Sequence, residues 1–486
     1  RKPVRVLYCD FLSMYPTVCT LMQLWQFVIA DGMTWHDSTD ETRQLVNNLT
    51  INDLQDRDFW KRLRTLVRIQ PSDDVLPIRA QYGHDAQKTI GLNRLTSERP
   101  MWFTLADCIA FKLLTGRTPI VLEACTYTPK PPQAGLMPIM LSGNASYRIN
   151  PSDVDFYKAV IDLRQAVKRQ QNQAGKDGRI NDEERLAAEQ FALKILANAT
   201  SYGIFVEVNV EELDGRETVD CFGIDDQPFP VQSTKIEKPG SYFHPLLATL
   251  ITGAARLFLA ITERLATDAS IDWAFCDTDS MAVAQPDGMP DDSFMQAARS
   301  VRAWFDPLNP YETKGQLLKE EDANFAPENG AELPLYCFAI SAKRYALFNL
   351  DGDGCPIIRK ASAHGLGHLR PPYQDNDAPA SIPKPTVSLD EIGVERWQHD
   401  LWYQIVSAAL AGRPNQPDLD FHDALQRPAI SRYGATTPAL LAWFKAFNAG
   451  RPYHEQVRPF GFMTALHSGS FPASASDELL DATKTR

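Results

Sequence analysis

The chain has 486 residues, of which 44% are apolar and 23% charged, and this ordinary globular composition excludes a mostly disordered protein. At roughly 150 residues per domain, the length predicts about three domains, or one large enzyme with several lobes. The net charge of −12 counts against nucleic acid as a partner, but only weakly, because a net charge does not show where the cations lie.

Three further features indicate where the protein works. The eight Cys residues are scattered and form no CxxC pair, so we expect neither zinc ligands of that spacing nor a disulfide scaffold, and a reducing cytoplasm is favoured. The most apolar segment, 245–266, contains Arg256, Glu263 and Arg264, so no membrane span is expected. The chain begins at Arg1 with neither a Met nor a signal peptide, and we expect it to be part of a longer protein. If the source is bacterial, we expect association with the nucleoid.

The first 150 residues give one clear motif. Residues 4–10 form a short apolar run typical of a strand, and it ends at Asp10-Phe-Leu-Ser-Met-Tyr-Pro. Ser13 is predicted to cap a helix that starts near Pro16. Residues 31–150 are mixed, with one helix expected over 56–67, and no pattern in them assigns a function.

The next segment predicts two helices joined by a short turn. Ser152-Asp-Val-Asp155 has the capping-box pattern and predicts a helix to about residue 174, and Asn181 is predicted to cap a second helix that runs to about residue 200. Because the turn between them, 175–178, is short and polar, we expect an antiparallel helical hairpin.

The second half predicts strands, followed by helices. A β-hairpin is expected around Asp214-Gly215, a helix over 245–266, and strands over 271–276 and 281–284 on either side of Asp277-Thr-Asp-Ser280. A further hairpin is expected around 351–354. The last hundred residues predict helices, among them one over 394–411.

Three carboxylates at strand ends predict a metal site. Asp10 ends one strand, and Asp277 and Asp279 lie in the turn between two others. Such carboxylates repel one another unless divalent cations neutralise them, and oxygen ligands suit Mg²⁺. Two Mg²⁺ ions about 4 Å apart stabilise both the attacking and the leaving oxygen of a phosphoryl transfer. An isolated Asp-x-Asp turn is more often a solvated loop, and this alternative applies if the motif stands by itself.

The helical hairpin supplies cations of the right spacing to bind phosphates. Arg164 and Lys168 are four residues apart and share a helix face, and Lys194 and Asn198 repeat this spacing on the second helix. Side chains from both helices could therefore converge on one triphosphate. The alternative is a solvated face, in which neighbouring acids such as Asp162 and Glu189 pair with these cations, and for Arg164 and Lys168 considered by themselves it is the favoured interpretation.

Taken in order, these motifs resemble those of family B DNA polymerases. The resemblance rests on Asp10-x-x-Ser13-x-Tyr15-Pro16, Arg164-x-x-x-Lys168, Gln190-x-x-x-Lys194-x-x-x-Asn198 with Tyr202-Gly203, and Asp277-Thr-Asp-Ser280. Asp-Thr-Asp-Ser alone is moderate evidence, whereas the ordered set is specific. Two weaker matches, Thr252-Gly-Ala-Ala-Arg256 and Ala342-Lys-Arg-Tyr345, follow the same order, and the resemblance covers about half of the chain.

The resemblance implies a role for each motif residue. Asp10 and Asp279 would be the principal ligands of two Mg²⁺ ions, with Mn²⁺ as a substitute, and Phe11 and Asp277 would lie at the same metals. The remaining roles fall into two sets. At the nucleotide, the backbone of Phe11, Leu12, Ser13 and Met14 would surround the triphosphate, and Tyr15 would lie beneath the sugar as a barrier to ribonucleotides. The phosphates would be bound by Arg164, Lys168 and Lys194. The same pocket would be lined by Asn198 and Tyr202. The primer end would be contacted by Lys343, Arg344 and Tyr345.

The resemblance also implies an α+β fold with named parts. A palm made of an antiparallel sheet covered by helices would comprise residues 1–30 and 204–370, helical-hairpin fingers 151–203, and a mainly helical thumb 371–486, with 31–150 as an insertion or palm elaboration. The chain departs from the family at three places, the first of which is the stretch 31–150, much longer than usual between the first motif and the helical hairpin. Asn198-Ala-Thr-Ser-Tyr202 has one residue more than the usual spacing, and Ala342 stands where a Lys is often found.

The expected function is template-directed addition of deoxynucleotides to a primer 3′-hydroxyl, in DNA replication or repair, with primer-template DNA and a dNTP as partners and no membrane. The N-terminal and exonuclease regions usual in the family are absent from these 486 residues, so we expect them elsewhere in the same protein or in a separate chain. The alternatives are a catalytically inactive, polymerase-like protein that binds DNA or assembles a complex, and an enzyme that synthesises RNA or copies it.

Overall fold

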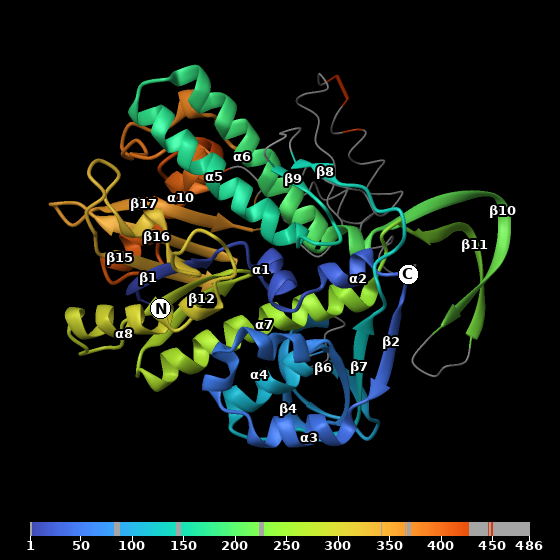
Figure 1. Ribbon diagram of the computed structural model, residues 1–486. Helices are drawn as coiled ribbons and strands as arrows, with labels where there is room; N and C mark the ends of the chain where they lie inside the picture. The colour runs from blue at the N-terminus through green and yellow to red at the C-terminus, as the bar shows by residue number, and fades with distance from the viewer. Residues whose placement is uncertain are drawn as a thin grey trace. The chain divides into compact units, whose positions relative to one another are not determined.

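The structure is a computed structural model that describes residues 2–81, 88–141, 147–222, 228–341, 343–364, 366, 371–426, 446 and 449–450. In this part of the chain helices are mixed with antiparallel sheets, as expected for the α+β class (Figure 1). The chain divides into two compact units, which comprise residues 1–9, 272–291 and 320–486, and residues 10–271 and 292–319. The palm, fingers and thumb, with their boundaries, stay a prediction.

The first unit is built on one sheet with the strand order β12–β13–β1–β15–β16–β17. The pairs β12/β13, β1/β15, β15/β16 and β16/β17 are antiparallel. The strands and the two following helices are β1 (Val4–Phe11), β12 (Asp272–Asp277), β13 (Ser280–Ala284), β15 (Leu335–Ser341), β16 (Arg344–Leu350), β17 (Pro356–Ala363), α9 (Leu389–Ile392) and α10 (Arg396–Leu410). The strands expected on either side of the Asp-Thr-Asp-Ser motif and the hairpin around 351–354 are thus confirmed.

Both faces of this sheet are buried, because its central strands are apolar at successive positions. Tyr345 and Leu347 pack on one face with Tyr8 and Phe275, whereas Phe348 packs on the other with Trp402 of α10. β12 and β13 are therefore anchored in the core of one face and β17 in the core of the other, and β15 and β16 contribute to both.

The second unit contains the helices that carry the cationic motifs. Figure 1 shows α5 and α6 as the antiparallel pair that the sequence predicts. Its longer helices are α1 (Met14–Leu21), α3 (Thr39–Asn48), α4 (Leu105–Thr115), α5 (Phe156–Lys176), α6 (Ile180–Ser201), α7 (Pro245–Asp268) and α8 (Asp291–Ala303), which belongs to this unit from residue 292 on. The caps differ from the prediction. Asp155, not Ser152, accepts the Lys158 N–H at 3.1 Å, and α6 starts one residue before Asn181.

α7 is long and apolar enough to cross a membrane by length and composition, but 67% of its most apolar window is buried. It packs closely against α4: a Cβ on Gly253 would lie 2.3 Å from Thr104 Oγ1, at the start of that helix. Arg256 donates two hydrogen bonds to the buried carboxylate of Asp107, at 2.7 and 2.9 Å. These contacts are those of a core helix.

The described part of residues 31–150 contains α3, α4 and an antiparallel sheet with the order β2–β7–β3–β6, which comprises β2 (Met33–Asp37), β3 (Thr65–Gln70), β6 (Met101–Thr104) and β7 (Ile120–Pro129). A separate hairpin joins β4 (Ser72–Gln81) to β5 (Lys88–Thr96). The helix expected over 56–67 is wrong beyond Leu63: a 3₁₀ helix, Arg57–Leu63, leads into β3, because Thr65-Leu-Val-Arg-Ile-Gln alternates between buried and half-buried positions.

The hairpin expected around Asp214-Gly215 is also wrong. β10 (Val208–Phe222) runs through this dipeptide and pairs with β11 (Pro228–Pro239), and the register shifts between Glu212 and Glu217. Asp-Gly serves here as an irregularity within a long strand, because glycine fits a bulge as readily as a turn.

Candidate functional site

The first motif is anchored by an aromatic core in the second unit. Asp10 and Phe11 are the last residues of β1, and Phe11 is 1% exposed. Its ring stacks on Phe258 and meets Phe305 edge to face, with both centroids 5.0 Å away. Because a packed aromatic cluster resists displacement, Asp10 is fixed at the start of the following turn.

The turn after Phe11 is tight and strained. Ser13 has φ +48°, in the left-handed region, and its side chain makes no capping bond to α1, which begins at Met14. The Leu12 N–H donates to the Leu317 carbonyl at 2.8 Å, and Thr17 Oγ1 donates to the Leu12 carbonyl at 2.7 Å. Such strain persists where the surroundings impose it and is common at functional sites. Among the backbone amides predicted to surround a triphosphate, that of Leu12 is already engaged.

Arg164 links three parts of the predicted nucleotide site. Its Nε donates to Gln190 Oε1 on α6 at 2.8 Å, and its Nη1 donates to Ser13 Oγ at 3.4 Å. Burial lowers the pKa of Arg164, and the negative charge of Asp10 opposes that shift. Arg164 nonetheless stays charged, since arginine deprotonates far above neutral pH. Arg164, a half-buried cation of α5, thus contacts both the first motif and α6 and lies near Asp10.

The described contacts do not show the pairing that the alternative interpretation, a solvated face, assigns to Asp162 and Glu189. Asp162 pairs with Lys158, and Glu189 lies 3.7 Å from Arg185. The acids that could have paired with Arg164 and Lys168 therefore have other partners. Lys168 is exposed, as are the other two predicted contacts on α6, Lys194 and Asn198.

Tyr15 and Tyr202 lie side by side. Their ring centroids are 5.5 Å apart and the rings are inclined at 46°. Both side chains are half-buried. The additional residue between Asn198 and Tyr202 therefore does not carry Tyr202 away from the first motif.

The acidic turn lies in the first unit, between β12 and β13. Asp277 pairs in register with Ser280, and the turn is closed by the Asp279 N–H, which donates to the Asp277 carbonyl at 2.8 Å. Thr278 has φ +61°, which is unfavourable for a β-branched residue. The two motif turns thus share a strained, left-handed residue beside the acids.

The predicted primer-contacting segment lies beside this turn, in the same unit. Lys343 Nζ forms an ion pair with Asp277 and donates to Thr278 Oγ1 at 3.4 Å. Arg344 is exposed, and its Nε donates to the His364 carbonyl at 3.0 Å. Tyr345 is 2% exposed and stacks on Phe275 with centroids 3.8 Å apart, and burial raises its pKa. This position gives Tyr345 a role in the core, and its contact with a primer stays a prediction.

Among the described residues, no three His, Cys, Asp or Glu side chains form a ready-made metal site. Mg²⁺ in phosphoryl transfer is typically held by one or two carboxylates together with substrate phosphates and water, rather than by an all-protein cage. The oxygen ligands of Asp10, Asp277 and Asp279 have the chemistry that this ion prefers.

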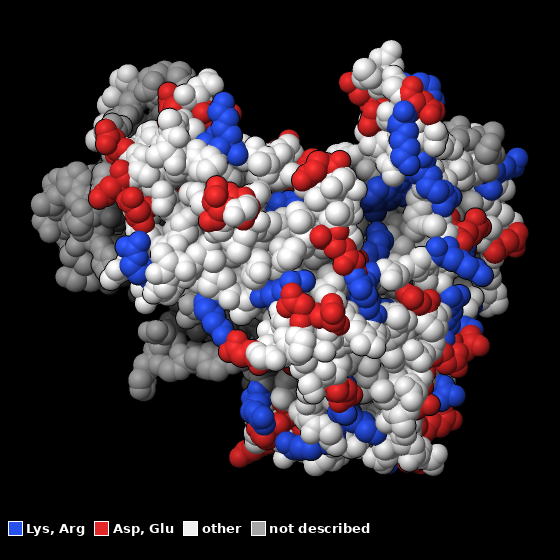
Figure 2. Space-filling view, turned by 90° about the vertical axis from the view of Figure 1, so that its left-hand side faces the viewer, with Lys and Arg blue, Asp and Glu red and all other residues white. Residues whose placement is uncertain are grey.

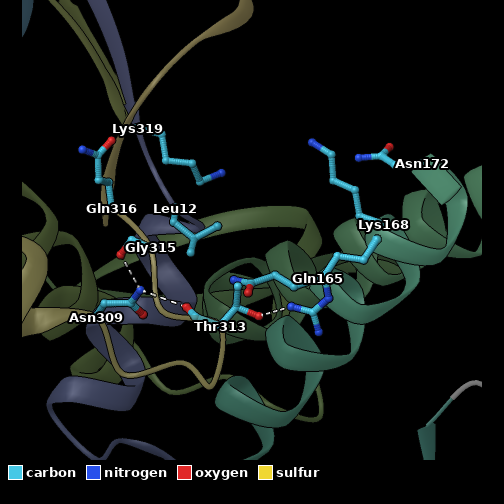
Figure 3. Close-up of a pocket in the computed structure, with 10 residues that line it drawn as sticks. Leu12, Gln165, Lys168, Asn172, Asn309, Thr313, Gly315, Gln316 and Lys319 are labelled. Atoms are coloured by element: carbon cyan, nitrogen blue, oxygen red, sulfur yellow. Dashed lines mark hydrogen bonds between the residues drawn. The ribbon is translucent and has the colours of Figure 1, made fainter. Parts of the chain in front are cut away.

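A cavity of about 250 Å³ in the second unit adds residues that the sequence motifs did not include (Figure 3). It is lined by Leu12 and Lys168 of the motifs, and also by Asn172 and Lys319. The i,i+4 series Arg164, Lys168, Asn172 on α5 could have predicted Asn172. No local pattern marks Lys319, since it follows a loop far along the chain.

No family model and no curated protein matches the chain. Among solved structures, it is similar to phi29 DNA polymerase in complexes with primer-template DNA and incoming nucleotides, with primer-template DNA, and with single-stranded DNA. In the same order, the TM-scores are 0.31, 0.31 and 0.32, and the sequence identities are 11%, 11% and 12%. The three alignments cover 72%, 75% and 75% of this chain, and 47%, 51% and 50% of the solved chains. The chain therefore spans about half the length of these solved chains, and scores this low support no conclusion by themselves.

Proposed function

We propose that this chain is the polymerase part of a template-directed DNA polymerase resembling family B. The observation that carries the proposal is the Arg164 side chain, which contacts Ser13 of the first motif and Gln190 of α6. Motifs about 150 residues apart in sequence therefore meet within one unit, at the turn that follows Asp10. A structural role for these helices would not require this convergence of family-like motif residues.

The proposal includes a metal site for Asp10, Asp277 and Asp279, whose oxygen ligands suit Mg²⁺, and strand pairing within the first unit bears on it as far as Cys9. β13 is the neighbour of β1, and the Gln285 N–H, just after β13, donates to the carbonyl of Arg5, near the start of β1. The two strands must then run in opposite directions, so that the Asp-Thr-Asp end of β13 lies toward Cys9. Asp10 follows Cys9 directly in the chain. Two Mg²⁺ ions held by these carboxylates would supply a Lewis acid at the reacting phosphate.

The cations would bind and orient the nucleotide. A nucleoside triphosphate carries about four negative charges, which Arg164, Lys168 and Lys194 would neutralise together with the metals. Asn198 would line the same pocket, and Tyr15 would lie beneath the sugar. Lys343 and Arg344 would contact the primer near its 3′ end. The primer 3′-hydroxyl would then attack the α-phosphate, and pyrophosphate would leave.

Primer extension with Mg²⁺ tests this proposal, with Asp279→Ala as the diagnostic variant. We expect extension to fall by about 10³-fold or more, because a principal metal ligand is lost. Asp353→Ala is the matched control, since Asp353 is exposed in a distant turn of the same unit. Equal extension by the parent and Asp279→Ala contradicts the proposal. DNA binding without extension by a folded parent protein favours the inactive, polymerase-like alternative.

A further inference from the structure

A second cavity of the second unit lies in the segment 31–150, which contains none of the motif residues. Its volume is about 530 Å³, within the roughly 300–1,000 Å³ of pockets that bind small molecules. One wall is a row of side chains across three strands, in which Thr126 of β7 pairs with His36 of β2 and with Thr65 of β3. The helix α3 supplies Glu41 and Leu45, which are four residues apart and therefore share a helix face.

The buried part of the cavity lining consists mainly of hydroxyl groups held in fixed positions. Thr65 is 2% exposed, and Ser38 and Thr42 are each 4% exposed. Thr126 Oγ1 lies 2.7 Å from Thr65 Oγ1 and donates to Ser38 Oγ at 2.8 Å. The Ser38 N–H donates to the Ala124 carbonyl, and the Ser38 carbonyl accepts the Thr42 N–H, both at 2.9 Å. The site is thus formed before a ligand binds, which lowers the entropic cost of binding one.

Two of these hydroxyls have a proton to donate to a ligand. Ser38 precedes α3 as its N-cap, yet its side chain makes no capping bond, and Asp37 Oδ1 accepts the Thr39 N–H at 2.9 Å instead. Because Ser38 Oγ accepts the proton of Thr126, its own O–H is left without an acceptor among the described residues. The Thr42 hydroxyl has no partner in the same part of the chain. Buried hydroxyls in this state are unfavourable, so both favour a ligand that accepts hydrogen bonds, as a carboxylate does.

Opposite charges line the exposed part of the same cavity. Arg62 and Glu41 both border it, and neither forms an ion pair with another residue that the structure describes. An available guanidinium binds a carboxylate through two parallel N–H groups, and an available carboxylate accepts from an ammonium. With His36 neutral, the formal charges of the described lining cancel. A ligand that carries both charges therefore finds a partner for each, whereas a simple anion is repelled by Glu41.

We propose that this cavity binds a zwitterionic α-amino acid with a large apolar side chain. Arg62 and the available hydroxyls of the lining would bind the carboxylate, and Glu41 would bind the ammonium. The side chain would pack on Leu45 and Leu105, which supply the apolar part of the lining. This inference goes beyond the proposed polymerase activity, since none of these residues belongs to the motifs.

Calorimetric titration of the full chain with L-phenylalanine, in the absence of DNA and nucleotides, tests the site. We expect saturable binding, and binding about tenfold or more weaker for phenylalaninamide, which lacks the carboxylate, and for N-acetylphenylalanine, which lacks the ammonium. Glycine should also bind more weakly, because it has no side chain to bury against Leu45 and Leu105. Absence of binding by L-phenylalanine, or equal binding by both capped derivatives, overturns the proposal.

Two variants assign the two charged groups of the ligand. Arg62→Ala should bind L-phenylalanine about tenfold more weakly and no longer prefer it to phenylalaninamide, and Glu41→Gln should lose the preference over N-acetylphenylalanine. Arg148→Ala and Glu98→Gln are the matched controls, because both residues are exposed in the same unit and do not line the cavity. Preferences that stay unchanged in Arg62→Ala and Glu41→Gln, or an equal loss in the controls, contradict the assignment. The assay contains no DNA or nucleotide, so its outcome is independent of the proposed polymerase activity.

Discussion

At the scale of single residues, the contacts around Tyr15 fix its orientation from within its own unit. Tyr202 lies against its ring, and Thr17, two residues later, bonds both the Leu12 carbonyl and the Tyr311 hydroxyl, at 2.7 and 2.8 Å. Thr17 is fully buried, so these bonds are expensive to break. The proposed barrier role requires a ring held in place, which the contact with Tyr202 and the fastened turn would provide.

Tyr15→Ala should therefore raise ribonucleotide incorporation relative to deoxynucleotide incorporation, roughly tenfold or more, because the lost ring leaves room for a 2′-hydroxyl. The measurement is the ratio of kcat/KM for matched ribo- and deoxynucleotides in primer extension. Tyr15→Phe should behave as the parent, since the ring remains. Tyr242→Ala is the control, because Tyr242 is 63% exposed. An unchanged ratio in Tyr15→Ala contradicts the barrier role and favours the RNA-synthesising alternative.

At the scale of elements, α7 depends on a titratable cap. His244 is its N-cap, and its Nδ1 accepts the Leu247 N–H at 3.4 Å, which requires a neutral ring at that nitrogen. Burial lowers the pKa of His244 below its ordinary value of 6.5. Protonation would remove the acceptor and place a positive charge at the positive end of the helix dipole.

Stability should consequently fall on the acid side of pH 6.5. The pKa of His244 is lower in the folded state, so the unfolded chain binds the proton first as the pH falls. The contribution of His244 to the free energy of unfolding is therefore complete above the pKa of the unfolded state, and it is lost as the pH falls through the pKa of the folded state. His244→Asn keeps a capping acceptor that does not titrate. We expect the difference in free energy of unfolding between parent and variant, measured with urea, to change between pH 7.5 and pH 5. A difference independent of pH contradicts this assignment.

The sequence predicted those elements whose signals are local. The paired helices, the strands around Asp-Thr-Asp-Ser and the hairpin near residue 352 were predictable because apolar periodicity and turn residues specify them directly. The path of β10 was not, since Asp-Gly fits both a turn and a bulge. Lys319 could not be assigned to the cavity, because its place there depends on a loop that Asn309 closes locally and that Arg169 of α5 fastens through a tertiary hydrogen bond.

At the scale of the whole molecule, a net charge of −12 does not prevent DNA binding if cations are concentrated locally. Figure 2 shows Lys and Arg gathered in patches among the acidic side chains on the face in view. Counterion release makes the logarithm of the binding constant fall linearly with that of the salt concentration, by about 0.9 per neutralised phosphate of duplex DNA. The slope of the logarithm of the binding constant against that of the salt concentration therefore depends on the number of cations that contact DNA phosphates, and not on the net charge of the protein.

Lys343 allows this counting to be tested, because it has two candidate partners. It pairs with Asp277, yet the proposed function places it on the primer. If metal takes over Asp277 and releases Lys343 to a phosphate, Lys343→Ala should lower the magnitude of the slope by about 0.9.

The measurement is the fluorescence anisotropy of a labelled primer-template at several salt concentrations and a fixed Mg²⁺ concentration. Lys384→Ala should leave the slope unchanged, since Lys384 is an exposed lysine of the same unit with no predicted DNA contact. An unchanged slope in Lys343→Ala would mean that Lys343 neutralises Asp277 in the complex as well, and that the primer is held by other residues.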